Sequence, residues 1–213
     1  MDLLVTGFGP FPHVRVNPTA ALAREVARRL VRAGFDARAL VLETSYAGGL
    51  PALRDHLDEM RPRAVLMLGL AARARFVRVE LFARGRSSAL HTDARGATPA
   101  EVPSPSRGLP RRTTAAASAA LGAIRRSGIR VRLSPSAGRY LCDACYAATL
   151  AGSGAGVPVI FIHVPWLRPS AGIKPAGRVA RFRPGSPPLA AALAALGRDL
   201  AIAGRRNLRA RTG

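Results

Sequence analysis

Asp2-Leu3-Leu4-Val5-Thr6-Gly7-Phe8-Gly9-Pro10, close to the start of the chain, decides the fold class. This stretch is a short apolar run that ends in glycine and proline, which is typical of a buried strand followed by a turn. Residues 18–32 then carry apolar side chains at helical spacing, with Asn17 as an N-cap and Pro18 at the first helical position. The stretch therefore predicts a βα unit.

The same alternation of strand and helix patterns continues along the chain. The run 64–68 is continuously apolar, as in strands that are buried on both faces of a parallel sheet. Other strand patterns occupy 35–43, 75–83, 129–133 and 157–164, helical patterns occupy 50–60, 113–126, 140–150 and 189–203, and long loops occupy 85–110 and 165–188. No internal repeat interrupts this order. The sequence predicts an α/β protein: a three-layer α/β/α sandwich with a twisted, mostly parallel (mixed) sheet.

Length and composition predict one folded domain over residues 1–213. The chain is 48% hydrophobic and 21% charged, which excludes a disordered chain. Its two cysteines exclude a disulfide scaffold and a four-thiolate zinc module, and they favour a reducing compartment. The longest charge-free stretch, 144–162, is interrupted by a Gly/Ser/Pro segment, and the start carries no basic leader. We expect a cytoplasmic protein that does not associate with membranes.

The net charge of +21 suggests a polyanionic partner, because Lys and Arg contacts to phosphate supply most of the non-specific affinity for nucleic acid. However, only one of the 33 basic residues is a lysine, Lys174, and the arginines come with abundant Ala, Gly and Pro, the pattern of GC-rich codons. The arginines are scattered, and 5% aromatic residues offer no stacking platform. We therefore expect no specific nucleic-acid partner. We interpret the basic tail, about 205–213, as a frayed terminus.

Two titratable residues lie within apolar strand patterns. Of the four histidines only His163 does so, near the end of a strand where α/β sheets place their ligands. A lone histidine there is more often a hydrogen-bonded structural residue than a base. Glu80 is an acid among apolar residues, so it is either partnered or at an exposed edge. As the group that orients a catalytic imidazole, Glu80 would face His163.

Cys142 follows a glycine-containing turn, 136–141, that leads from a strand into a helix. A thiol at a helix N-terminus is expected to have a lowered pKa, and the free N–H groups there can hold an oxyanion. The alternative is a small core residue. Cys142-Asp143-Ala144-Cys145 also matches the C-x-x-C of dithiol oxidoreductases, but no early βαβ context accompanies it. We therefore interpret Cys145 as an apolar helix residue.

Three motifs resemble those of pyroglutamyl peptidase I (pyrrolidone carboxyl peptidase), the C15 family of cysteine peptidases. Thr6-Gly7-Phe8-Gly9-Pro10-Phe11, followed by Asn17-Pro18-Thr19, is similar to the family's opening signature. Ser136-Ala137-Gly138-Arg139-Tyr140-Leu141-Cys142 resembles its nucleophile motif, and Phe161-Ile162-His163-Val164-Pro165 resembles its histidine motif. The motifs occur in the family's order and spacing, and the resemblance covers roughly the first 170 residues.

The resemblance implies an enzyme that removes an N-terminal pyroglutamyl (5-oxoproline) residue from peptides. It implies a catalytic triad of Cys142, His163 and Glu80, without a metal or organic cofactor. The substrate-binding residues that it implies are Phe8 and Phe11, which would sandwich the lactam ring, together with Asn17, Thr44, Tyr140 and Leu141. The resemblance also suggests a homo-dimer or homo-tetramer.

The match departs from the family after the glutamate. The family has an Asn and then an Arg that helps to hold the oxyanion, and Gly85 and Leu90 occupy those positions here. Loss of one such donor typically costs ~2.7–4 kcal/mol. We expect Arg84, Arg86 or Arg95 to replace it, with the backbone of the nucleophile helix as the other source. The alternative is a catalytically impaired or re-specified relative that binds an acidic partner.

Overall fold

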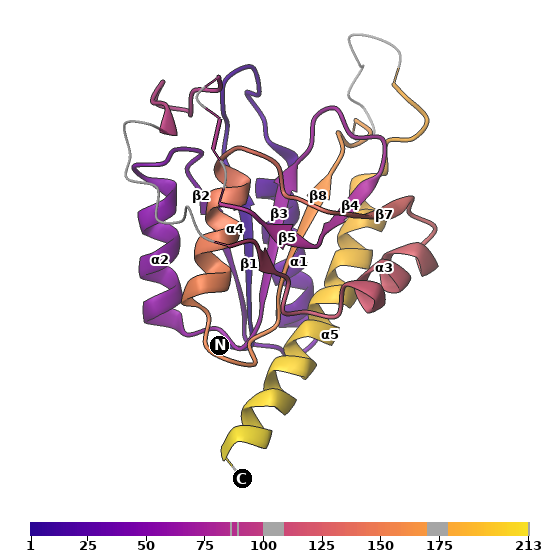
Figure 1. Ribbon diagram of the computed structural model, residues 1–213. Coiled ribbons are helices and arrows are strands. Elements are labelled where there is room, and N and C mark those ends of the chain that lie inside the picture. Colours follow the sequence, from indigo (N-terminus) through magenta and orange to yellow (C-terminus); the bar gives the residue numbers. More distant parts are fainter. Residues whose placement is uncertain (86, 89, 100–108, 170–178, 213) are drawn as a thin grey trace.

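The structure is a computed structural model that describes residues 1–85, 87–88, 90–99, 109–169 and 179–212 (Figure 1). In chain order its elements are β1 (Leu3–Phe8), α1 (Pro18–Arg32), β2 (Ala37–Leu42), α2 (Gly49–Met60), β3 (Val65–Leu70), β4 (Val77–Glu80), β5 (Phe82–Ala83), β6 (Arg111–Arg112), α3 (Ala117–Arg126), β7 (Val131–Ser134), α4 (Leu141–Gly152), β8 (Val159–Val164) and α5 (Ser186–Thr212). The predicted alternation of strands and helices is confirmed.

Six strands form one sheet in the order β2-β1-β3-β8-β4-β7. The first four of these are parallel, β4 runs antiparallel to β8, and β7 is parallel to β4. Helices α2 and α4 cover one face of the sheet, whereas α1, α3 and α5 lie behind it (Figure 1). The predicted three-layer sandwich with a mostly parallel, mixed sheet is therefore confirmed.

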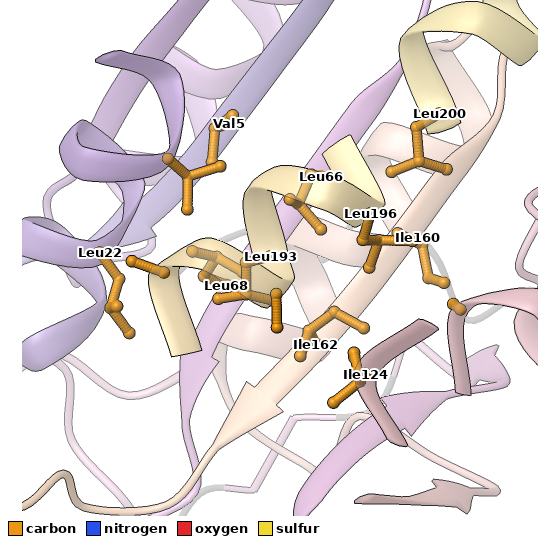
Figure 2. Close-up of a cluster of buried hydrophobic side chains, with 14 of the residues drawn as sticks. Val5, Leu22, Leu66, Leu68, Ile124, Ile160, Ile162, Leu193, Leu196 and Leu200 are labelled. Atoms are coloured by element: carbon orange, nitrogen blue, oxygen red, sulfur yellow. The ribbon is translucent and has the colours of Figure 1, made fainter. Parts of the chain in front are cut away.

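Each face of the sheet carries its own apolar core. In the larger core, Leu22 of α1, Ile124 of α3 and Leu193 of α5 pack against strand residues such as Leu66 and Ile160 (Figure 2). All five are almost completely buried, and burial of such a side chain contributes about 1.5–3 kcal/mol. The second core lies under α2 and α4.

The alternation of side chains along β8 and β4 decides where their polar residues lie. In β8, Ile160 and Ile162 belong to the larger core, so Phe161 and His163 point toward α4. In β4, Val77 and Val79 also belong to the larger core. Arg78 and Glu80 therefore share the α4 face with His163, and the antiparallel register pairs Arg78 with His163 and Glu80 with Phe161. The fold thus brings polar side chains from two adjacent strands to one face.

Helix α3 begins four residues later than the apolar pattern suggests. Thr113 Oγ1 donates to the carbonyl of Val159 at 2.7 Å, and Thr114 Oγ1 donates to the carbonyl of Val157 at 2.7 Å. Thr114 Oγ1 also accepts from the Val159 N–H at 2.8 Å. These bonds hold the two threonines against the start of β8, so the helix begins only at Ala117.

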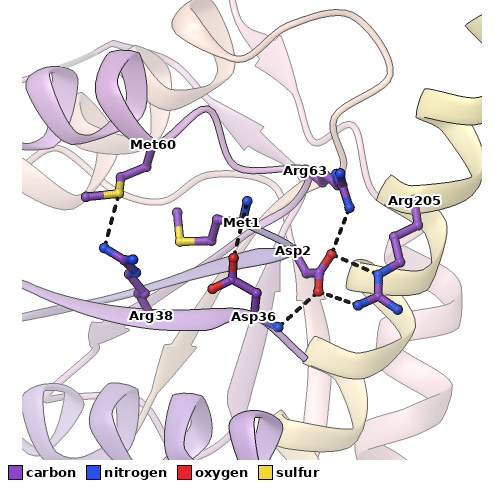
Figure 3. Close-up of polar contacts among 7 residues, drawn as sticks. All are labelled: Met1, Asp2, Asp36, Arg38, Met60, Arg63 and Arg205. Carbon is purple, nitrogen blue, oxygen red and sulfur yellow. Dashed lines mark hydrogen bonds and ion pairs between the residues drawn. The ribbon is translucent and has the colours of Figure 1, made fainter. Parts of the chain in front are cut away.

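Helix α5 continues to Thr212, so the expected frayed terminus is wrong. Arg205 binds the buried carboxylate of Asp2 through Nε, at 2.8 Å from Oδ1, and through a second bond from Nη2 (Figure 3). The hydrogen bond from Arg205 is the main reason that the pKa of Asp2 lies well below its usual value. Gly204, the residue before Arg205, lets α5 approach the backbone of Arg63 closely, because a Cβ there would lie 2.1 Å from the Arg63 carbonyl oxygen. Charge pairing and close packing therefore extend the helix.

None of the helices in the described part of the chain is both long enough and apolar enough to cross a membrane.

Candidate active site

A cavity of about 280 Å³ lies where β1, β3 and β8 reach their C-terminal ends. Ligand sites of open α/β sheets are found at this edge. Cys142 and His163 both line the cavity, although they are far apart in the sequence. The two residues therefore share one site.

His163 and Glu80 form a buried pair beneath this cavity. His163 Nδ1 lies 2.9 Å from Glu80 Oε1, and the Glu80 side chain is fully buried. The hydroxyl of Tyr146 donates to the Glu80 carbonyl at 3.2 Å, which ties α4 to β4. A carboxylate that accepts from Nδ1–H fixes the imidazole tautomer and leaves Nε2 as its basic nitrogen. The predicted juxtaposition of Glu80 and His163 is therefore present.

Gly69 on β3 makes room for the imidazole ring. It is paired with His163 in the parallel β3–β8 register. A Cβ at residue 69 would lie 2.9 Å from His163 Cδ2 and 2.7 Å from two ring carbons of Phe161. The His163 and Phe161 rings pack against each other with centroids 4.7 Å apart. The position of the imidazole thus depends on the absence of a side chain on the neighbouring strand.

Cys142 is the second residue of α4 and is partly exposed. The turn before the helix contains Gly138 with φ of +102°, a backbone conformation that favours glycine. Tyr140 is the N-cap residue and has extended backbone angles. The first N–H groups of the helix therefore lie beside the thiol, as the sequence predicts.

The electrostatic environment of the thiol differs from the prediction. Burial, together with the nearby charges of Glu80 and Asp143, raises the pKa of Cys142 to about 12. Only the Cys142 backbone N–H acts in the opposite direction. The shift is therefore opposite in direction to the predicted lowering, with burial as its main cause. This direction of the pKa shift favours the neutral thiol over the thiolate.

Cys145, the second cysteine of α4, is fully buried in the core under that helix. Both cysteines are free thiols. The interpretation of Cys145 as an apolar helix residue is confirmed.

Aromatic residues form one wall of the cavity. Phe8, Phe11 and Tyr140 all line it, and the rings of Phe11 and Tyr140 lie 6.2 Å apart between centroids. Tyr140 OH donates to the carbonyl of Thr92 at 3.0 Å, which fixes the ring. Leu141, in contrast, is fully buried in the core and is not among the residues that line the cavity. Its prediction as a substrate contact therefore has no support in the geometry.

Asn17 and Thr44 also line the cavity, and both hold the same backbone group. Asn17 Nδ2 donates to the carbonyl of Gly9 at 3.1 Å, and Thr44 Oγ1 donates to it at 3.0 Å. The other end of the Asn17 amide accepts from the Thr19 N–H at 3.1 Å, which confirms the predicted N-cap. These two residues therefore fix the turn that follows β1.

Two of the three arginines predicted to replace the lost oxyanion donor, Arg84 and Arg95, do not line the cavity. Arg95 pairs with Glu43, with Nη2 at 2.7 Å from Oε2. The Arg84 backbone N–H donates to Asp143 Oδ1 at 2.9 Å, and neither arginine lines the cavity. Leu90 is 88% exposed. Arg86, the third predicted arginine, lies outside the described residues.

Two arginines that the sequence reasoning missed line the cavity instead, Arg78 and Arg139. Arg78 lies two residues before Glu80 in β4, so the two side chains share one face of the sheet. This period of two was the available signal for Arg78. Arg139 is part of the turn that precedes α4, and no periodic pattern marks it.

The cavity thus combines a thiol, an oriented imidazole and two guanidinium groups. A thiol with a base and a group that orients the base is the minimal set for nucleophilic acyl transfer. In the described part of the chain, no three His, Cys, Asp or Glu residues gather in a way that could hold a metal ion.

Comparisons with known proteins identify the family of the chain. The family model described as pyroglutamyl peptidase matches residues 1–202. A pyrrolidone-carboxylate peptidase of Gloeobacter violaceus is 31% identical over 170 residues, covering 78% of this chain and 82% of that protein. The crystal structure of pyrrolidone carboxyl peptidase from Thermus thermophilus aligns with a TM-score of 0.74 at 29% identity, covering 95% of this chain and 99% of that one. The enzyme from Thermococcus litoralis aligns with a TM-score of 0.77 at 26% identity, covering 98% and 95%. Sequence and fold together establish that the chain belongs to the pyroglutamyl peptidase family.

Proposed function

We propose that this family member is a cysteine peptidase that removes an N-terminal pyroglutamyl residue from peptides, with Cys142 as nucleophile, His163 as general base and Glu80 as the orienting carboxylate. The observation that carries the proposal is the buried 2.9 Å contact between His163 Nδ1 and Glu80 Oε1, at the wall of the cavity that Cys142 also lines. The two free thiols of the chain, Cys142 and Cys145, fit the reducing cytoplasm that the composition leads us to expect.

The proposed mechanism starts from a protonated Cys142 thiol, which the raised pKa favours. Burial and the charges of Glu80 and Asp143 raise the pKa to about 12, so the thiol carries its proton before the attack. His163 Nε2 then accepts that proton as sulfur attacks the carbonyl carbon of the pyroglutamyl residue. The resulting imidazolium protonates the departing amine, which leaves a thioester. A water molecule hydrolyses the thioester with His163 again as base, and the thiol is regenerated.

We assign the oxyanion to the backbone N–H groups at the start of α4. Those donors lie beside Cys142, the attacking residue, because it is the second residue of α4. A helix N-terminus also favours negative charge. Position 90 faces solvent and lies outside the cavity, so Leu90→Arg is expected to leave kcat unchanged. A tenfold or larger increase in kcat in that variant would contradict the backbone assignment.

The lactam ring is assigned to the aromatic wall. Phe8, Phe11 and Tyr140 line the cavity, and such an aromatic wall suits a flat five-membered amide. Asn17 and Thr44 support this wall through the Gly9 carbonyl. Their replacement is expected to weaken binding of the lactam by loosening the turn.

The test is turnover of pyroglutamyl-7-amino-4-methylcoumarin, together with mapping of thiol modification. Wild-type protein is expected to release coumarin, and Cys142→Ser and His163→Ala are expected to lose nearly all turnover. Iodoacetamide is expected to modify Cys142 and spare Cys145. Cys145→Ala is the matched control, because it removes the neighbouring thiol from the core and leaves the cavity intact.

An active Cys142→Ser protein, or wild-type turnover in His163→Ala, would refute the triad. A folded wild-type protein with no turnover would instead favour the alternative, an impaired relative that binds an acidic partner.

A further inference from the structure

We propose that Arg78 forms a subsite for the residue that follows pyroglutamate, and that this subsite selects substrates with an acidic second residue. The inference rests on the proposed function, because it takes the scissile bond to lie at Cys142 and His163. It adds a substrate class, pyroglutamyl peptides with a carboxylate side chain next to the lactam.

The order of the strands places the site residues one after another across the sheet. Phe8 at the end of β1 and Thr44 just after β2 lie on one side of β8, which carries His163. Arg78 on β4 lies on the other side of β8. With the lactam against the aromatic wall, the chain beyond the scissile bond extends across His163 toward β4. Arg78 is therefore on the leaving-peptide side of the site.

The Arg78 side chain is placed to meet a ligand there. Arg78 is paired with His163 in the antiparallel β4–β8 register, and both residues line the same cavity. The Nε of Arg78 is buried and has no hydrogen-bond partner within the described residues. Buried guanidinium N–H groups are normally satisfied, and a carboxylate is the acceptor that matches them best.

The charge of the cavity supports the same ligand. Arg139 lines the cavity with Arg78, and among the described residues that line it none is Asp or Glu. The carboxylate of Glu80 lies beneath the wall, fully buried against His163. The cavity thus presents two permanent positive charges and no negative charge to the leaving peptide. An acidic side chain complements it, whereas a lysine side chain would be repelled.

The experiment compares two substrates of nearly equal shape, pyroglutamyl-glutamic acid α-amide and pyroglutamyl-glutaminamide. Hydrogen bonds to charged groups are worth about 10- to 100-fold, so wild-type kcat/KM is expected to favour the glutamyl substrate by about tenfold or more. Because the contact exists before the reaction, the preference is expected mainly in KM. Arg78→Gln is expected to bring the ratio close to one, and Arg78→Lys is expected to keep part of it.

Arg132→Gln is the matched control. Arg132 is the β7 neighbour of Arg78 in the sheet register, but its guanidinium lies 5.2 Å from the centre of the Phe76 ring and it does not line the cavity. The variant removes the same charge and is expected to keep the substrate ratio. Equal wild-type kcat/KM for the two substrates, a preference that survives in Arg78→Gln, or equal loss in Arg132→Gln would each overturn the subsite.

These outcomes remain separate from those of the proposed function. Release of coumarin from the neutral pyroglutamyl amide tests the peptidase activity alone. Turnover of that amide with no preference for the glutamyl substrate rejects only the subsite. No turnover of any pyroglutamyl amide rejects the activity, and the subsite with it.

Discussion

Replacement of Gly69 by alanine should disable the base without replacing any catalytic residue. The new Cβ would lie 2.7 Å from Cε1 and Cζ of Phe161 and 2.9 Å from Cδ2 of His163. Carbon atoms pack at about 3.5–4.0 Å, so the rings must retreat by about 0.6–1.3 Å. Phe161 is fully buried between Phe8 and Tyr146, with ring centroids 6.4 and 5.4 Å away. The imidazole of His163 therefore has to move more than the Phe161 ring.

A displacement of this size breaks the alignment of the 2.9 Å contact between His163 and Glu80. A misplacement of about 1 Å typically costs about 10²-fold in rate, so kcat for Gly69→Ala is expected to fall by about 100-fold. Overpacking should also lower the free energy of unfolding by about 1–3 kcal/mol. Steady-state kinetics with the coumarin amide separates the rate effect from unfolding. The temperature should be well below the melting temperatures of both the wild-type and the Gly69→Ala protein.

Gly152→Ala is the control for this change. Residue 152 ends α4, the helix of Cys142, and a Cβ there meets no heavy atom within 4 Å. The control is expected to keep wild-type kcat and wild-type stability. A folded Gly69→Ala protein with kcat within threefold of wild type would refute the argument that Gly69 positions the imidazole.

Three further predictions concern charged groups and the thiol. Glu80→Gln is expected to lower kcat by at least about 10²-fold with KM within a few fold, because the imidazole loses its orienting charge; unchanged kcat would contradict this role. Alkylation of Cys142 by iodoacetamide is expected to rise about tenfold per pH unit from pH 7 to 10, since its pKa is raised to about 12; a plateau below pH 8 would show a stable thiolate instead. The pKa of Asp2 is lowered from its ordinary 3.8, so its stabilising effect is present above pH 4 and is lost as pH falls toward the folded-state value. Asp2→Asn should therefore lower the melting temperature by several degrees at pH 6, and this deficit should shrink below pH 4; a constant deficit would contradict the linkage.

The parts of the fold that the sequence predicts correctly are those encoded locally. The apolar periodicities of β1 and α1 and the Asn17 cap depend on neighbours within a few residues, so a single chain displays them. The position of β4 between β8 and β7 depends on pairing across long sequence separations. His163 and Glu80, 83 residues apart, meet only because of that pairing. Spacing alone could suggest the partnership but not the register that creates it.

The arginines of the cavity and the pKa of Cys142 could not be predicted from the sequence for similar reasons. Arg78 is one of 33 basic residues, and the only local signal that separates it from an arginine on the surface is its spacing of two residues from Glu80. The loop arginines looked suitable because of their distance from Leu90 along the chain, yet Arg95 is engaged by Glu43, which lies 52 residues away. The raised pKa of Cys142 comes from burial and from the charges of Glu80 and Asp143, which a helix pattern does not reveal.

The pair between Asp2 and Arg205 joins residues 203 positions apart, and this separation has a consequence for the order of folding. During synthesis β1, α1, β2 and β3 emerge early and can pair with one another, because their contacts are local. Until residue 205 is made, the carboxylate at the start of β1 lacks its main partner. The docking of α5 against the nascent sheet is therefore expected to be the step that commits the chain to its final state.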